Sequence, residues 1–152
     1  MSTQAILQIV TACIGSLGFA VLFNVRGIRL VAAAIGGLLS WGIYLLCYHY
    51  LAYDPACYFL SAAFVTTYAE VMARALKTPT TVFITSSLIP LVPGGSLYYT
   101  MAYAFQSDAE RFAEKAVYTL QLAAALAIGI ITATALARLI VRIFCIRKKE
   151  TA

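Results

Sequence analysis

The sequence predicts an all-α integral membrane protein with five transmembrane helices, and two observations lead to this fold class. Hydrophobic residues make up 62% of the 152 residues, and the mean hydropathy is +0.88. Charged residues make up only 11%, whereas soluble domains carry roughly 25%. A small soluble domain cannot bury this much apolar surface, and the chain lacks the polar, basic surface of a nucleic-acid-binding domain. We therefore expect a single membrane domain over residues 1–152, surrounded by a lipid bilayer and without a nucleic-acid partner.

Intervals free of Asp, Glu, Lys and Arg predict the individual spans, because a transmembrane helix needs about 20 mostly apolar residues. These intervals cover residues 1–25, 30–53, 55–69, 78–107 and 116–137. The third interval is long enough only if its helix continues past Glu70 to about Leu76. None of the intervals alternates polar and apolar residues as a β-barrel strand does. The predicted helices lie near residues 4–23, 30–51, 56–76, 80–105 and 116–138.

The first span is expected to be a retained helix, because no Lys or Arg precedes it and no Ala-x-Ala cleavage site follows it. The second and fifth spans contain small residues four apart, a spacing that lets helix backbones approach closely. These pairs are Ala32 with Gly36, Ala33 with Gly37, and Ala125 with Gly129. Cys47 and Cys57 flank the connection between the second and third spans, and the sequence leaves open either a disulfide or two free thiols there.

The loops predict an N-out, C-in orientation. With the N-terminus outside, nine of the eleven basic residues lie on the cytoplasmic side, as the positive-inside rule requires for short loops. These nine are Arg26, Arg29, Arg74, Lys77, Arg138, Arg142, Arg147, Lys148 and Lys149. The same orientation places Asp54 outside and Glu70 within the third span.

The fourth predicted span carries the most specific feature, the stretch Ile89-Pro90-Leu91-Val92-Pro93-Gly94-Gly95-Ser96. A continuous helix over its charge-free interval would be about 45 Å long, against a hydrocarbon core of about 30 Å. Two prolines remove backbone donors and clash with the preceding turn, and two glycines follow at once. We therefore expect this helix to break at Pro90–Gly95. The break lies about 18 Å from the cytoplasmic end of the helix, near the middle of the bilayer.

Unwound backbone at that depth is tolerated only where protein buries it or where it lines a watery cavity. Broken helices of this kind form the binding sites of secondary transporters. The second half-helix would begin at the glycines or at Ser96, and its free N–H groups and positive dipole end suit a carboxylate. The alternative is a proline-kinked packing helix that binds nothing. The predicted substrate-binding residues are Pro90, Pro93, Gly94, Gly95, Ser96, Tyr98, Tyr99 and Thr100.

Glu70 and Arg74 form a second candidate site. They lie four apart on one face of the third span, in the order that favours a helical ion pair, and an ionisable group inside a span is a functional candidate. Either Glu70 carries a coupling proton or gates transport, or the pair is a salt bridge whose Arg74 reaches the membrane surface. Asn24, at the inner end of the first span, is either a further substrate contact or a helix cap. Motifs of hydrolases, P-loops and zinc sites are missing from the sequence, which predicts neither an enzyme nor a cofactor.

Three stretches of the chain carry a family resemblance. They are Phe23-Asn24-Val25, the segment from Glu70 to Phe83, and the segment from Ile89 to Met101. Together they resemble the threonine/serine exporter family, and more narrowly its small, second-half, YjjB-like subunit, over roughly residues 5–140. Arg26 stands where a proline is expected and Ser96 where a third glycine is frequent, which leaves fine substrate details open.

The resemblance implies one half of an inverted-repeat transporter in the plasma membrane of a bacterium, with a larger membrane subunit as its partner. An odd number of spans independently suits this arrangement, in which the site lies between the two halves. The implied activity is export of threonine and serine, substrates that bear a carboxylate. The alternatives are export of C4-dicarboxylates such as succinate, a homo-oligomer in place of the larger partner, or a membrane scaffold that transports nothing.

Overall fold

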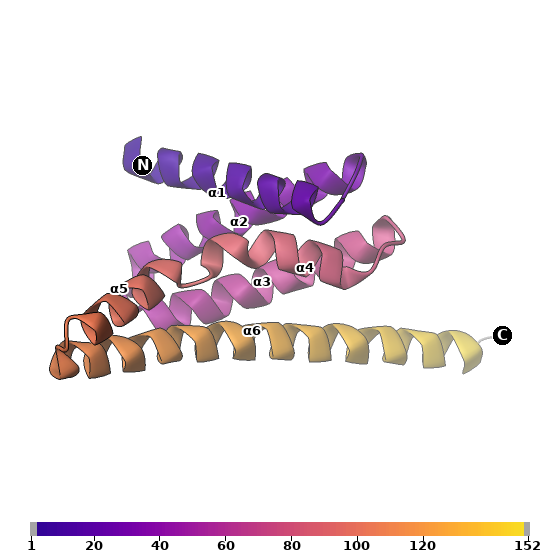
Figure 1. The fold of residues 1–152 in the computed structure, drawn as a ribbon. Helices are drawn as coiled ribbons and strands as arrows, with labels where there is room; N and C mark the ends of the chain where they lie inside the picture. Colours follow the sequence, from indigo (N-terminus) through magenta and orange to yellow (C-terminus); the bar gives the residue numbers. More distant parts are fainter. Residues whose placement is uncertain (1–2, 151–152) are drawn as a thin grey trace.

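The computed structural model describes residues 3–150, with side chains described for residues 3–141. All elements in this part of the chain are helices, which confirms the predicted all-α fold. Figure 1 shows them side by side, with the first helix beginning and the last helix ending at opposite ends of the bundle. In chain order they are α1 (Thr3–Leu22), α2 (Ile28–Leu51), α3 (Asp54–Ala75), α4 (Thr80–Leu88), the 3₁₀ turn η1 (Ile89–Leu91), α5 (Gly94–Phe105) and α6 (Ala109–Glu150).

The helices have the lengths and compositions of membrane spans. Four of them, α1, α2, α3 and α6, are long and apolar enough to cross a bilayer alone. The remaining candidate is a bent pair, in which residues 80–91 and α5 meet at an angle of 57°. Counted as one crossing, this pair confirms the five predicted spans and the predicted break in the fourth. Which end of the bundle faces the cytoplasm stays a prediction.

The last helix, α6, is longer than the helix that the charge-free interval at residues 116–137 predicted. α6 begins at Ala109 rather than near residue 116, because Asp108 supplies a helix cap. The Asp108 carboxylate accepts a hydrogen bond of 3.1 Å from the Arg111 backbone N–H, which is the contact that a capping aspartate makes. The charged turn at residues 110–115 therefore belongs to the helix, although it lies outside the apolar segment.

Small residues determine how closely the helices pack. A side chain on Gly37 of α2 would collide with the Ser16 hydroxyl of α1, and one on Gly36 would collide with α4. A Cβ atom on Gly129 of α6 would lie 2.7 Å from the Phe59 carbonyl oxygen of α3. These contacts confirm the packing faces predicted in the second and fifth spans.

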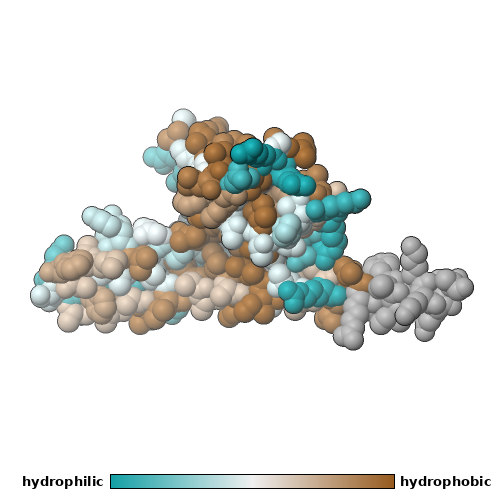
Figure 2. Space-filling view, turned by 45° about the vertical axis from the view of Figure 1, so that its right-hand side comes forward, coloured by the Kyte–Doolittle hydropathy of each residue, from teal (hydrophilic) through white to brown (hydrophobic). Residues whose placement is uncertain are grey.

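α3 lies at the centre of the bundle, in contact with α2, α4 and α6, whereas α5 packs mainly on α6. Many large apolar side chains stay exposed on the outer helices; Leu7, Leu120 and Ile131 are each more than 60% exposed. Figure 2 shows hydrophobic residues over much of the visible face. An apolar exterior of this extent matches the environment of a lipid bilayer.

Candidate functional site

The break in the fourth crossing is short and lies midway along it. α4 has nine residues and η1 three, and α5 on the other side has twelve. Val92 has an extended backbone (φ −63°, ψ 123°), and Pro93 precedes the first residue of α5. Pro90 lies in the first turn of η1, where its missing N–H disturbs the backbone bonding least. The two prolines thus stand on either side of Leu91 and Val92, where the chain passes from η1 to α5.

The N-terminus of α5 presents open backbone donors. Gly94 donates to the Val92 carbonyl oxygen at 2.7 Å, and Leu97 donates to Pro93 at 3.0 Å. The N–H groups of Gly95 and Ser96, between these two, have no acceptor among the described residues. Side chains built on Gly94 or Gly95 would meet open space. Two free donors and the positive end of a twelve-residue helix form a site that favours an anion.

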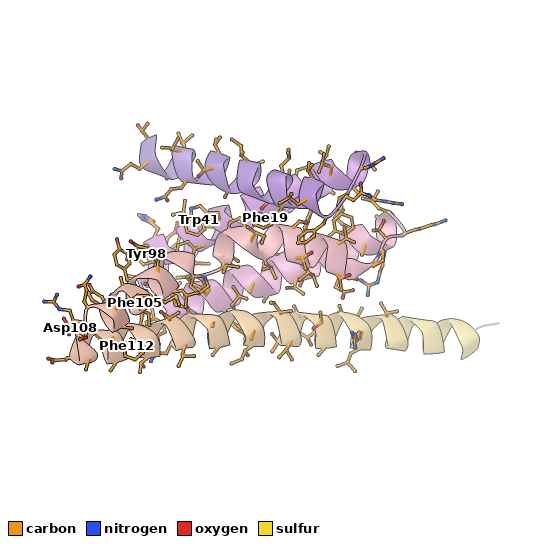
Figure 3. All side chains as sticks on the ribbon, in the orientation of Figure 1. Phe19, Trp41, Tyr98, Phe105, Asp108 and Phe112 are labelled. Carbon is orange, nitrogen blue, oxygen red and sulfur yellow. The ribbon has the colours of Figure 1, made fainter. Side chains whose placement is uncertain are left out.

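The hydroxyl side chains predicted to join this site point in different directions. Tyr98 and Tyr99 are 69% and 56% exposed, their rings 5.5 Å apart, and Tyr98 points away from α6 (Figure 3). Thr100 is buried against α6, where its hydroxyl lies 3.2 Å from that of Thr119 and 2.8 Å from the Ser96 carbonyl oxygen. Thr100 therefore joins α5 to α6, and Tyr98 and Tyr99 lie on the exposed side of α5.

Asn24 lies away from the break. It occupies the turn between α1 and α2 in the left-handed conformation, with φ of 57°, and its Oδ1 accepts a hydrogen bond of 3.0 Å from Arg26 Nε. It borders a hollow together with Thr78 and Val82, at the opposite end of α4 from η1. The structure thus does not bring Asn24 to the open amides of α5.

Glu70 and Arg74 form the ion pair that their spacing predicts. Arg74 Nη1 lies 2.8 Å from Glu70 Oε2 and also donates to the Glu70 carbonyl oxygen at 2.7 Å. The Glu70 side chain is 10% exposed, whereas that of Arg74 is 46% exposed. The pair lines a groove of about 400 Å³ between α3 and α6. It lies in the last turns of α3, and the structure keeps it apart from the start of α5.

The structure also contains a polar cluster that the sequence did not predict. Asp54 begins α3, and its carboxylate accepts hydrogen bonds from the Tyr44 hydroxyl of α2 at 2.7 Å and from the Tyr118 hydroxyl of α6. The Tyr58 ring packs edge-on against Tyr44, with centroids 5.1 Å apart. Tyr118 is 64 residues from Asp54, so no local pattern pairs them. The sequence signal for this cluster was a single acidic residue, Asp54, next to the tyrosine-rich end of the second span.

Other reactive side chains do not form a site. Among the described side chains, no three His, Cys, Asp or Glu gather closely enough to hold a metal ion. Cys47 and Cys57 are both free thiols, which decides the alternative that the sequence left open. Three hydroxyls are fully buried without a partner in the described part of the chain, those of Ser16, Ser61 and Thr66.

Comparison with known proteins assigns the chain to a family. The family described as Threonine/Serine exporter, ThrE, matches residues 8–136, a segment that includes most of α1, all of α2 through α5, the break and most of α6. No match to the chain was found among curated proteins or among solved structures. The matched segment covers most of the chain and contains both candidate sites. The chain therefore belongs to the threonine/serine exporter family, whose members are membrane transporters.

Proposed function

We propose that the chain is the small subunit of a secondary transporter that exports threonine, serine and similar amino acids across the plasma membrane of a bacterium. The substrate carboxylate binds at the N-terminus of α5, where Gly94, Gly95 and Ser96 present their backbone. Pro90 and Pro93 keep this segment out of the helix. Tyr98 and Tyr99 add hydroxyl contacts from the open side.

The observation that carries this proposal is the pair of unsatisfied N–H groups at Gly95 and Ser96. They lie midway along a crossing, where a backbone donor left in contact with lipid costs several kcal/mol. Gly94 and Gly95 are both exposed, and a side chain built on either of them would meet open space among the described residues. A site between this chain and another membrane subunit removes that cost, because it encloses water or substrate.

A larger subunit of the same family is the proposed partner. In the five-crossing unit, α1 begins and α6 ends at opposite ends of the bundle (Figure 1), so a second such unit can join it in the inverted arrangement typical of secondary transporters. α5 is the face for this partner, since it packs mainly on α6 and leaves Tyr98 and Tyr99 exposed. A second copy of the chain is the alternative occupant of this face.

Glu70 and Arg74 are proposed to gate the transporter or to couple it to an ion gradient. They form a charged pair inside a span, and such residues usually lie on substrate or ion pathways. Because the pair lies near the end of α3 and the amides lie at the middle of the fourth crossing, the two sites act at different depths of the membrane.

Flux through proteoliposomes tests the proposed function. Vesicles would contain this chain alone, the larger subunit alone, or both, and the release of labelled threonine, serine and succinate would be measured. The proposal predicts release of threonine and serine only from vesicles that hold both subunits. Release by the larger subunit alone would make this chain a scaffold, and release of succinate without amino acids would change the substrate class.

A further inference from the structure

The groove between α3 and α6 has the composition of a small-molecule site. Its volume of about 400 Å³ lies within the range of roughly 300–1,000 Å³ typical of ligand pockets. The walls from α6 are apolar, and Val71 of α3 adds to them. The polar lining residues are Thr67, Glu70 and Arg74, which lie on one face of α3 at spacings of three and four. Such a site is apolar except for a few convergent polar groups.

The ion pair in this groove leaves part of its hydrogen-bonding capacity unused. Arg74 makes both of its contacts to Glu70 through Nη1. Its Nε and Nη2 atoms bind no other described residue, and neither does Glu70 Oε1. The Arg74 side chain is 46% exposed, and its guanidinium still offers N–H donors in a planar fork, the geometry that binds a carboxylate with two parallel hydrogen bonds.

We propose that this groove is a second substrate site, which recognises the paired charges of an α-amino acid. The carboxylate of the amino acid binds the free N–H groups of Arg74, and the ammonium group of the same amino acid binds Glu70 Oε1. The two charged groups of the ligand are bonded to the same carbon atom, and the two charged groups of the pair lie side by side, 2.8 Å apart at their nearest atoms. Thr67, whose hydroxyl donates to the Ala63 carbonyl oxygen at 2.8 Å, retains an acceptor lone pair for a substrate hydroxyl.

The same arrangement disfavours a dicarboxylate. A second carboxylate of the ligand would lie beside Glu70, where like charges repel in a groove with apolar walls. The open amides of α5 cannot make this distinction, because they bind any carboxylate and offer no anionic group to an ammonium. The inference rests on the proposed function and makes it more specific, because it assigns the choice of amino acids over dicarboxylates to Glu70.

Ligand selectivity tests this inference separately from the proposed function. The complete exporter, with both subunits in lipid nanodiscs, would be titrated with threonine and with N-acetylthreonine, which lacks the ammonium. Wild-type protein should bind threonine more tightly, and Glu70→Gln should reduce this preference about tenfold or more, since a hydrogen bond to a charged group is lost. Glu110→Gln, at an exposed acid in the first turn of α6, is the control and should keep the preference.

Each outcome has one meaning. If Glu70 had only a structural role, its replacement would lower the affinities for threonine and N-acetylthreonine by the same factor. An unchanged preference for threonine in Glu70→Gln therefore contradicts the groove site, even if both affinities fall. If Glu70→Gln fails to fold, Arg74→Lys serves as the second variant, because it keeps the positive charge but removes the planar pair of N–H donors. It should weaken the binding of threonine and of N-acetylthreonine to the same extent. Unchanged binding by Arg74→Lys contradicts the site. Failure of the wild-type exporter to bind or transport threonine overturns the proposed function itself.

Discussion

The Tyr118 hydroxyl of α6 donates a hydrogen bond to the Asp54 carboxylate, which also accepts one from Tyr44. Asp54 thereby connects α2 and α6 through the first turn of α3. The carboxylate lies at a helix N-terminus, where the dipole favours negative charge, and both of its oxygens are satisfied. This cluster fixes three spans at the end of the bundle where α3 begins.

Replacing Tyr118 by Phe is expected to destabilise the protein, because one carboxylate oxygen loses its donor while the ring keeps its packing. Hydrogen bonds between membrane helices contribute about 0.6 kcal/mol on average and about 1.7 kcal/mol at most, so the loss should lie in this range or slightly above it. Reversible unfolding in mixed micelles measures it. Tyr99→Phe, on an exposed ring, is the matched control, and an equal effect of the two substitutions would contradict a role for the cluster in stability.

Gly37→Ala is expected to loosen the contact between α1 and α2. The added methyl would overlap with the Ser16 side chain, and overpacking of this kind costs about 1–3 kcal/mol. The same substitution at Gly42, also on α2, meets open space and should be neutral or slightly stabilising. Thermal unfolding of both variants provides the comparison. Equal stability of the two would show that α1 and α2 do not pack through these glycines.

Thr100→Val is expected to release α5 from α6. The substitution keeps the shape of the side chain but removes the hydroxyl contact with Thr119, and α5 has no comparable contact with another helix. Hydrogen exchange of the α5 backbone should become faster, while exchange in α3 stays unchanged. Thr85→Val, whose hydroxyl bonds only within α4, is the control. Unaltered exchange in α5 would mean that apolar packing alone holds this half-helix.

Water access at the break is expected from the proposed function. In a cysteine-free background, Ser96→Cys should react with a membrane-impermeant maleimide in the assembled exporter, because transport requires an aqueous pathway to this depth. Ile131 of α6 is 64% exposed, and Ile131→Cys should react slowly with the maleimide, since lipid covers this position. Equal labelling of the two positions would contradict a water-lined site at the start of α5.

The sequence predicted the crossings well, because their apolar length is a local property of the chain. Two further features were local in the same sense. The break at Pro90–Gly95 was predicted from the backbone chemistry of proline and glycine, and the ion pair of Glu70 with Arg74 was predicted from their helical spacing. The start of α6 was missed because charge marks the edge of the membrane rather than the end of a helix. Asp108 has the side chain of a cap, but its position outside the apolar segment hid that role.

Long-range contacts were beyond such patterns. The predicted site grouped Thr100 and Asn24 with the amides, yet Thr100 packs against α6 and Asn24 lies at the other end of α4. Whether a residue of a broken helix faces the opening depends on which neighbour packs behind it, and the order of residues does not contain that information. The cluster of Asp54 with Tyr118 was missed for the same reason, because its partners come from three helices.

Threonine export by a Gly95→Leu variant, expressed with the larger subunit, tests the central claim most directly. The leucine side chain enters open space and should leave the fold intact while it covers the N–H groups at the start of α5. Gly18→Leu, at an exposed glycine of α1 that also faces open space, is the control and should transport normally. We predict loss of export from Gly95→Leu at an unchanged amount of inserted protein. Export at the wild-type rate by that variant would contradict a carboxylate site at the break.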